Sequence, residues 1–151
     1  MREIKLRVWD KMLKCFWYEL PDSYTLSLDG KILLYGNISK DMKLIQFTGL
    51  QDVTGKDIFD GDIVEFDYYE SERNQYENIE SGSFGKIEYH ANTCSYDIVF
   101  SKEDLCISIG DEDTGYGLEL NIATRLKVIG NIFENPELLE RGRGKENYSV
   151  S

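Results

Sequence analysis

Few residues in this chain of 151 amino acids have the types and spacing that enzyme chemistry needs. The single histidine, His90, excludes catalytic or metal centres that require two imidazoles, including the H-E-x-x-H zinc motif. One histidine could act as a general base, but no nucleophile-elbow sequence accompanies it. We therefore interpret His90 as a structural residue and expect no catalytic residue.

The segment from Gly49 to Lys56 contains two glycines and a lysine, as phosphate-binding loops do. Five residues instead of four separate its glycines, and Asp57 stands where such a loop needs a serine or threonine to bind Mg²⁺. Gly49, Gly55 and Gly61 each follow a hydroxyl or acidic residue, a pattern typical of β-turns in which glycine adopts positive φ. The sequence predicts turns between strands here, and no site for a phosphate.

Metal ligands are equally sparse. The stretch Asp111 to Gly115, D-E-D-T-G, offers oxygen ligands but lacks the full twelve-residue calcium loop, so we interpret it as an acidic turn and leave cation binding there open. Cys15, Cys94 and Cys106 form no C-x-x-C pair, which favours free buried thiols over a disulfide or a zinc site. We expect no metal and no cofactor.

The elements that would position these residues are predicted to be strands nearly throughout. In the segment from Glu3 to Trp9, apolar residues alternate with Lys5 and Arg7, which predicts a strand with Lys5 and Arg7 on its solvent face. Short runs rich in β-branched and aromatic residues, separated by Gly, Asn, Asp or Ser, predict further strands. They are Met12–Glu19, Ser23–Leu28, Ile32–Tyr35, Lys43–Thr48, Asp62–Tyr68, Lys86–His90, Ser95–Ser101, Leu105–Ile109, Leu118–Ile122 and Arg125–Phe133.

This spacing predicts a mainly β fold: a meander plus a small barrel or sandwich, SH3-barrel-like in its C-terminal part. We expect a β-meander subdomain over residues 1–46 and a barrel-like subdomain over residues 47–140 that share a core. The polar segment from Tyr69 to Gly85 is predicted to be a long hairpin tip or loop. Asn135 and Pro136 are typical of a helix start, so one short helix should follow, and residues 141–151 should be a disordered tail.

Charge and hydropathy limit where the protein is expected to reside and which classes of partner it is expected to bind. No apolar run approaches the roughly 20 residues of a membrane span, and the N-terminus has no apolar signal segment, so we expect a cytoplasmic protein without membrane contact. Net charge is −11, and residues 57–80 alone hold nine acids and one base, which we expect to lie on one outer surface. Because nucleic-acid affinity depends on neutralising phosphates with Lys and Arg, direct binding of nucleic acid is not expected.

Three blocks of the chain together resemble the YopX-like family of phage and prophage proteins. They are R-E-I-K-L-R-V-W-D near the N-terminus, F-T-G-L-Q-D-V-T-G-K-D-I-F-D-G-D-I-V in the centre, and V-I-G-N-I-F-E-N-P-E-L-L-E near the C-terminus. The resemblance implies a mainly β protein encoded by a phage or prophage, in the cytoplasm of a bacterial host. It implies no particular activity.

Two classes of function follow. The first is a non-enzymatic interaction module whose acidic, tyrosine-containing segment docks on a basic surface of a host or phage protein, because tyrosine joins apolar area to a hydroxyl. A variant of this hypothesis is mimicry of a phosphate array that inhibits a host DNA-binding protein, and the simpler interpretation is an acidic loop that only solvates the fold.

The second class is a carboxylate-dependent enzyme acting on a small or sugar substrate. Exposed strand edges and tyrosines also allow self-association. The predicted docking residues are Tyr69, Glu70, Glu72, Tyr76, Glu77 and Glu80.

Overall fold

The computed structural model describes residues 5–66, 82–100, 106–109, 112–113, 120–121 and 125–144. These residues form antiparallel strands and one short C-terminal helix, which confirms the predicted mainly β fold. In this part of the chain, no helix has the length and apolar character of a membrane span. The elements are β1 (Leu6–Asp10), β2 (Cys15–Trp17), β3 (Tyr24–Leu26), β4 (Ile32–Leu34), β5 (Asn37–Ile38), β6 (Met42–Gln51), β7 (Asp57–Phe59), β8 (Asp62–Phe66), β9 (Ser83–His90), β10 (Ser95–Phe100), β11 (Cys106–Ser108), β12 (Glu112–Asp113), β13 (Leu120–Asn121), β14 (Leu126–Asn131) and α1 (Glu137–Gly144).

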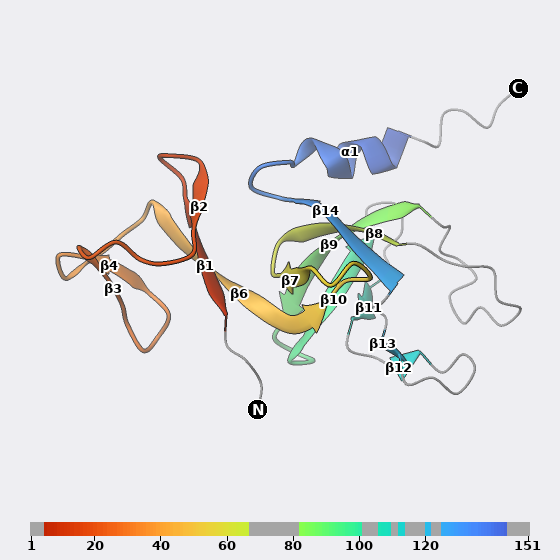
Figure 1. Cartoon of the computed structure of the whole chain (residues 1–151), viewed down its shortest axis with the longest axis horizontal. Helices are drawn as coiled ribbons and strands as arrows, with labels where there is room; N and C mark the ends of the chain where they lie inside the picture. The colour runs from red at the N-terminus through yellow and green to blue at the C-terminus, as the bar shows by residue number, and fades with distance from the viewer. Residues whose placement is uncertain are drawn as a thin grey trace, which may run out of the picture.

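Two larger sheets form the body of the molecule. One has the strand order β2-β1-β6-β7 and the other β11-β10-β9-β8-β14, while β3-β4-β5 and β12-β13 form two smaller sheets. Figure 1 shows the small sheet β3-β4-β5 projecting at one end, beyond β1 and β2, and α1 lying along the outside of the five-stranded sheet. The predicted meander over residues 1–46 is therefore divided between two sheets.

Strand β6 connects the two ends of the molecule. Its first half pairs with β1, from Met42 opposite Asp10 to Gln46 opposite Leu6. Its second half pairs with β7, which begins only a few residues after β6 ends. The expected subdomain boundary between residues 46 and 47 thus falls inside one continuous strand of ten residues.

Backbone hydrogen bonds join the two larger sheets into a half-barrel. The tight turn between β7 and β8 is held by Asp60 N, which donates to Gln46 O at 3.0 Å, and by Gly61 N, which donates to Ile87 O at 2.8 Å. Past the end of β6, Val53 N donates to Leu126 O on β14 at 2.9 Å. Because the segment after β6 occupies this edge of β14, the barrel is closed on that side and open between β6 and the β9–β10 hairpin.

Strand β1 is buried on both faces, so the prediction that Arg7 faces solvent is wrong. Arg7 is only 7% exposed, and its guanidinium lies 4.2 Å from the ring centre of Phe16 and 4.3 Å from that of Phe59. It forms an ion pair with Asp62 at the start of β8. An alternating pattern identifies the two faces of a strand. It cannot show that Asp62, 55 residues later, neutralises Arg7 and allows the charged face to be buried.

Gly49 adopts positive φ as predicted (90°), but it lies inside β6 and not in a turn. The pairing of β6 with β7 shifts register between Phe47 and Gln51, which marks an irregularity of the β-bulge type. Beside the glycine, the Thr48 hydroxyl accepts a hydrogen bond from Leu50 N at 3.2 Å. The turns predicted at Gly55 and Gly61 are present, with φ values of 84° and 81°.

The predicted C-terminal helix is present and begins at Glu137, directly after Asn135 and Pro136. It continues to Gly144, so the first four residues of the segment expected to be a disordered tail are helical. A helix extends at little cost once its first turn has formed, which explains why its end was placed too early. Residues 145–151 lie outside the described part of the chain.

Two hydrophobic clusters hold the half-barrel together. The smaller contains Trp9, Ile45 and Phe59, with Phe16 and Phe133 packed against it. Full burial of each such side chain stabilises the fold by about 1.5–3 kcal/mol relative to exposure. The larger lies between the two sheets of the half-barrel and contains Ile58, Val64, Phe66, Ile87, Ile98, Phe100, Ile109 and Leu126.

A close approach within the five-stranded sheet makes Gly85 sensitive to substitution. A Cβ at this position would lie 2.6 Å from Ile98 Cγ1 and 2.9 Å from the backbone oxygen of Val99. We expect Gly85→Ala to lower the free energy of unfolding by about 3 kcal/mol, measured by urea titration, because overpacking displaces neighbouring backbone. Gly36→Ala is the control, because a Cβ there meets no atom within 4 Å and the cost of about 1 kcal/mol is conformational. Equal losses would contradict the close approach.

Candidate functional site

The predicted docking residues Tyr69, Glu70, Glu72, Tyr76, Glu77 and Glu80 lie outside the described residues. What the structure describes is where their segment leaves the sheet. Strands β8 and β9 pair antiparallel up to Phe66 opposite Ser83, and Gly82 N donates to Phe66 O at 2.8 Å. The loop or hairpin tip predicted from Tyr69 to Gly85 is therefore wrong at its C-terminal end, because residues 83–85 belong to β9.

The three acids that precede this segment, Asp57, Asp60 and Asp62, differ in their surroundings. Asp57 receives hydrogen bonds from Lys5 at 2.9 Å and Gln51 at 3.0 Å, which lower its pKa. Asp62 is 1% exposed and pairs with Arg7. Burial raises the pKa of Asp62, and the Arg7 guanidinium opposes that shift. Burial also raises the pKa of Asp60. The interpretation that residues 57–80 place all their acids on one surface is therefore wrong for Asp62.

Asp10 serves local structure. Its Oδ1 accepts hydrogen bonds from Met12 N at 2.9 Å and Leu13 N at 3.0 Å, and its Oδ2 accepts one from Trp17 Nε1 at 3.2 Å. The hydrogen bond from Leu13 is the main reason that the pKa of Asp10 is lowered. This carboxylate organises the turn between β1 and β2.

Asp52 organises the turn that follows β6. Its Oδ1 accepts hydrogen bonds from the backbone and hydroxyl of Thr54 and from Lys56 N, and its Oδ2 accepts one from Val128 N at 2.8 Å. Burial alone would raise its pKa, but the hydrogen bonds from Thr54, Val128 and Lys56 outweigh burial and lower it. The turn containing Gly55 is therefore fastened to β14 and is not a ligand loop.

His90 lies at the end of β9, where its Nδ1 is 2.9 Å from Asp97 Oδ2 on the neighbouring strand. The hydroxyl of Ser95 donates to the other oxygen of Asp97 at 2.8 Å, and Thr93 bonds to that hydroxyl, also at 2.8 Å. In a serine hydrolase the histidine, not the carboxylate, receives the serine hydroxyl. The arrangement therefore fixes the β9–β10 hairpin and supports the structural interpretation of His90.

Glu112 and Asp113 are in β12, which pairs with β13, and the side chains of residues 111–115, where cation binding was left open, lie outside the described part. No group of three or more His, Cys, Asp or Glu with metal-holding geometry occurs among the described residues.

Cys15 is half-buried and Cys94 is exposed. The prediction of a buried thiol is wrong for Cys94, because this residue occupies the β9–β10 turn with φ of 51°.

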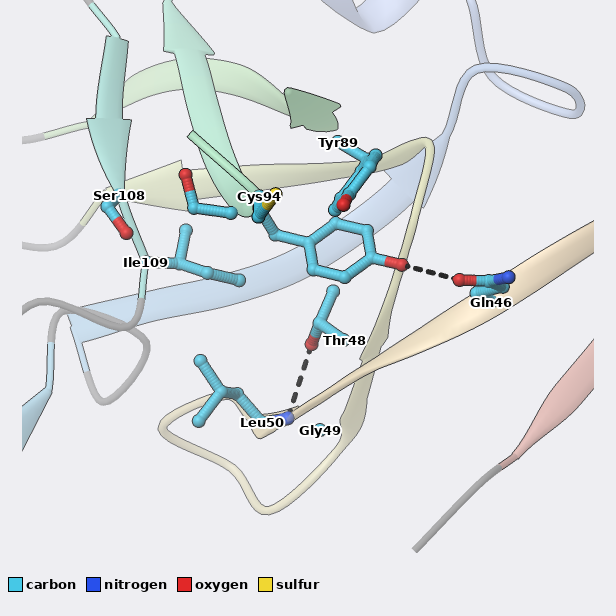
Figure 2. Close-up of a pocket in the computed structure, with 10 residues that line it drawn as sticks. Gln46, Thr48, Gly49, Leu50, Tyr89, Cys94, Ser108 and Ile109 are labelled. Carbon is cyan, nitrogen blue, oxygen red and sulfur yellow. Dashed lines mark hydrogen bonds between the residues drawn. The ribbon is translucent and has the colours of Figure 1, made fainter. Parts of the chain in front are cut away.

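The described residues form a pocket of about 500 Å³ at the open side of the half-barrel. Figure 2 shows Tyr89 and Cys94 on one side of it, Thr48 and Leu50 on the opposite side, and Ser108 and Ile109 along the flank. The full lining is Gln46, Thr48, Gly49, Leu50, Tyr89, Cys94, Ser95, Tyr96, Ser108 and Ile109, none of which carries a charged side chain.

Two tyrosines and one glutamine give the pocket its chemistry. Tyr89 and Tyr96 are opposite each other on β9 and β10, with ring centres 5.2 Å apart, and Tyr89 is 46% exposed. The Tyr96 hydroxyl donates to Gln46 Oε1 at 3.2 Å across the gap between the two sheets, drawn as a dashed line in Figure 2. The pocket thus has an aromatic wall and polar groups from two sheets, as ligand sites commonly do.

Sequence reasoning missed this pocket, although one signal for it was present. Tyr89 and Tyr96 flank the short turn H-A-N-T-C-S, and a hairpin register through that turn would have placed their rings on one face. The contribution of Gln46, 43 residues before Tyr89, had no signal in the sequence, because it depends on how β6 returns beneath the hairpin.

One family model and two solved structures match the chain. The family model described as YopX protein matches residues 5–140. The chain is similar to the crystal structure of YopX from Bacillus subtilis, with 19% identity, a TM-score of 0.52, and coverage of 91% of this chain and 98% of that one. It also matches protein EF1440 from Enterococcus faecalis, with 21% identity, a TM-score of 0.48, and coverage of 92% and 99%. No curated protein matches the chain.

Proposed function

The chain belongs to the YopX family, and we propose that it is a phage-encoded, non-enzymatic protein-interaction module of the bacterial cytoplasm. Its partner is a host or phage protein with a basic surface. The observation that carries the proposal is the exposure of apolar side chains at the projecting end of the molecule, together with the structural use of the buried acids.

The buried carboxylates argue against the enzyme alternative. An enzyme acting through two acids needs carboxylates that converge on a substrate. In the described part of the chain, Asp10, Asp52 and Asp97 hold turns and hairpins, and Asp62 neutralises Arg7. Acids committed to backbone and side-chain hydrogen bonds within the fold are poor candidates for catalysis.

Exposed apolar side chains favour a protein partner. Nine large hydrophobic residues are exposed in the described part, and seven of them come from residues 12–38, around β2 and the small sheet β3-β4-β5. Apolar surface concentrated in one region marks interaction sites in soluble proteins. The seven are Met12, Leu13, Tyr18, Leu26, Leu28, Tyr35 and Ile38.

Charge supports a basic partner. The net charge of −11 raises the rate of encounter with positive surfaces and opposes encounter with negative ones. Five of the acids behind this charge are in the Asp67 to Glu80 segment, which contains a single base, Arg73. In this proposal, the acidic segment and its tyrosines provide the first contact.

Charge reversal in that segment tests the proposal. The quadruple variant Glu70→Lys, Glu72→Lys, Glu77→Lys and Glu80→Lys changes four residues by two charges each, from a net −11 to −3. We expect it to reduce capture of the partner from infected-cell lysate at least ten-fold at about 150 mM salt, because most long-range attraction is lost. Mass spectrometry of the captured proteins measures the effect.

The matched control reverses four exposed acids outside both the acidic segment and residues 12–38, namely Asp41, Glu134, Glu137 and Glu140, and so produces the same net charge. If the control reduces capture as much as the test variant, net charge and not the acidic segment determines binding. Undiminished capture by the test variant would show that the acidic segment is not the docking surface.

A further inference from the structure

We propose that the pocket between β6 and the β9–β10 hairpin accepts an arginine side chain of the protein partner. This inference rests on the proposed function and gives its basic partner a specific anchor residue. Anchors of this kind bind in pockets near the centre of an interface, and arginine is among the residues most often found there.

Charge points to a cationic ligand. None of the ten lining residues is a Lys, Arg or His that would repel a cation, and the molecule as a whole carries −11. The summed field of a protein with this charge raises the local concentration of cations and lowers that of anions such as nucleotides. A phosphate-bearing ligand would also meet no basic group in the lining.

The geometry suits a flat cation. The exposed ring of Tyr89 offers a π-face beside Tyr96, and a guanidinium over such a face is attracted by the ring quadrupole. Acceptors lie on the facing walls, because Gln46 Oε1 can accept a second hydrogen bond besides the one from Tyr96, and Ser108 carries a hydroxyl. The core of the chain shows the stacking part of this geometry, because the Arg7 guanidinium lies between Phe16 and Phe59, although Asp62 also neutralises it there.

Arginine fits better than lysine for two reasons. Its planar guanidinium stacks on an aromatic face while its five N–H groups reach oxygens at the edges, and it is less strongly hydrated than an ammonium. The pocket has no carboxylate to offset the loss of hydration when a cation is buried. The weaker hydration of the guanidinium therefore lowers the desolvation cost of binding arginine relative to lysine. The pocket should therefore prefer arginine to lysine, and both to a neutral side chain.

Peptide titration of the purified full chain tests the inference. The probe is a capped Gly-Gly-Arg-Gly-Gly peptide, compared with peptides in which citrulline or lysine replaces arginine. Citrulline keeps the shape of arginine and removes its charge. Backbone amide shifts in NMR spectra should report saturable binding of the arginine peptide at Tyr89, Cys94 and Ser108. We expect the citrulline peptide to bind at least ten-fold more weakly and the lysine peptide about three-fold more weakly.

Variants separate the pocket from the rest of the surface. Tyr89→Leu should weaken binding of the arginine peptide about five-fold through loss of the π-face. Val53→Ala, at an exposed apolar residue outside both the pocket and the projecting end, should leave it unchanged. Equal affinity for arginine and citrulline, or shifts that do not saturate at these residues, would overturn the inference. The peptide titration contains no protein partner, so its failure would not contradict the proposed function. The charge-reversal experiment tests the proposed function independently.

Discussion

Asp62→Ala is expected to lower the free energy of unfolding by about 3–5 kcal/mol. The reason is the guanidinium that remains. Arg7 is 7% exposed and sits between two aromatic rings, so without Asp62 it would be a buried charge with no counter-ion. The same carboxylate also accepts a hydrogen bond from Phe59 N at 2.8 Å, which would lose its acceptor.

Urea titration followed by tryptophan fluorescence measures this loss, because Trp9 belongs to the hydrophobic cluster beside Arg7. The double variant Arg7→Met and Asp62→Leu is the control, because it removes both charges and keeps apolar volume. It should recover most of the lost stability, since replacing a buried ion pair by apolar residues is often neutral or stabilising. A loss below about 1 kcal/mol for Asp62→Ala would show that water reaches Arg7.

Asp52→Ala is expected to lower the free energy of unfolding by about 3 kcal/mol. This buried carboxylate accepts four hydrogen bonds, one of them from Val128 N on β14 and the rest from the turn that follows β6. Its removal leaves backbone N–H groups unsatisfied and releases the segment that covers the edge of β14. Asp22→Ala, at an exposed position, is the control and should change stability by no more than about 0.5 kcal/mol.

The effect of Asp52 should depend on pH in a defined direction. Its pKa is lowered in the fold, so the ionised form is the stabilising one. Its contribution is present above the pKa of an unfolded aspartate, about 3.9, and is lost as pH falls through the lower folded value. In the same urea titrations, Asp52→Asn should therefore be destabilised relative to the unmodified chain at pH 7 and progressively less so below about pH 4. A difference that stays constant with pH would contradict this assignment.

The class of fold was predictable because strand periodicity and turn chemistry are local. Ser95–Ser101 was predicted within one residue of β10, and the helix start at Asn135 and Pro136 was placed correctly. β7 was missed because three residues between two turn signals carry no periodicity. Pairing was also beyond sequence reasoning: the partner of β6 along its first half is β1, more than 30 residues earlier in the chain.

The site was less predictable than the fold. The acids around residues 57–62 were assigned to one surface by their density in sequence, but Asp62 faces inward because the turn at Gly61 directs the following strand into the core. The pocket depends on Gln46 and Tyr96 meeting across two sheets. This contact depends on tertiary packing. No residue near Gln46 or near Tyr96 in the sequence indicates that the two side chains meet.

The continuity of β6 also restricts how such a chain can evolve by recombination. A crossover that joined the first 46 residues of one relative to the remainder of another would splice a single strand in its middle, leaving Ile45 to pack in one parental environment and Leu50 in the other. Exchange of whole segments is better tolerated where the chain passes between strands, so a recombinant that joins two relatives within β6 is expected to be less stable than either parent.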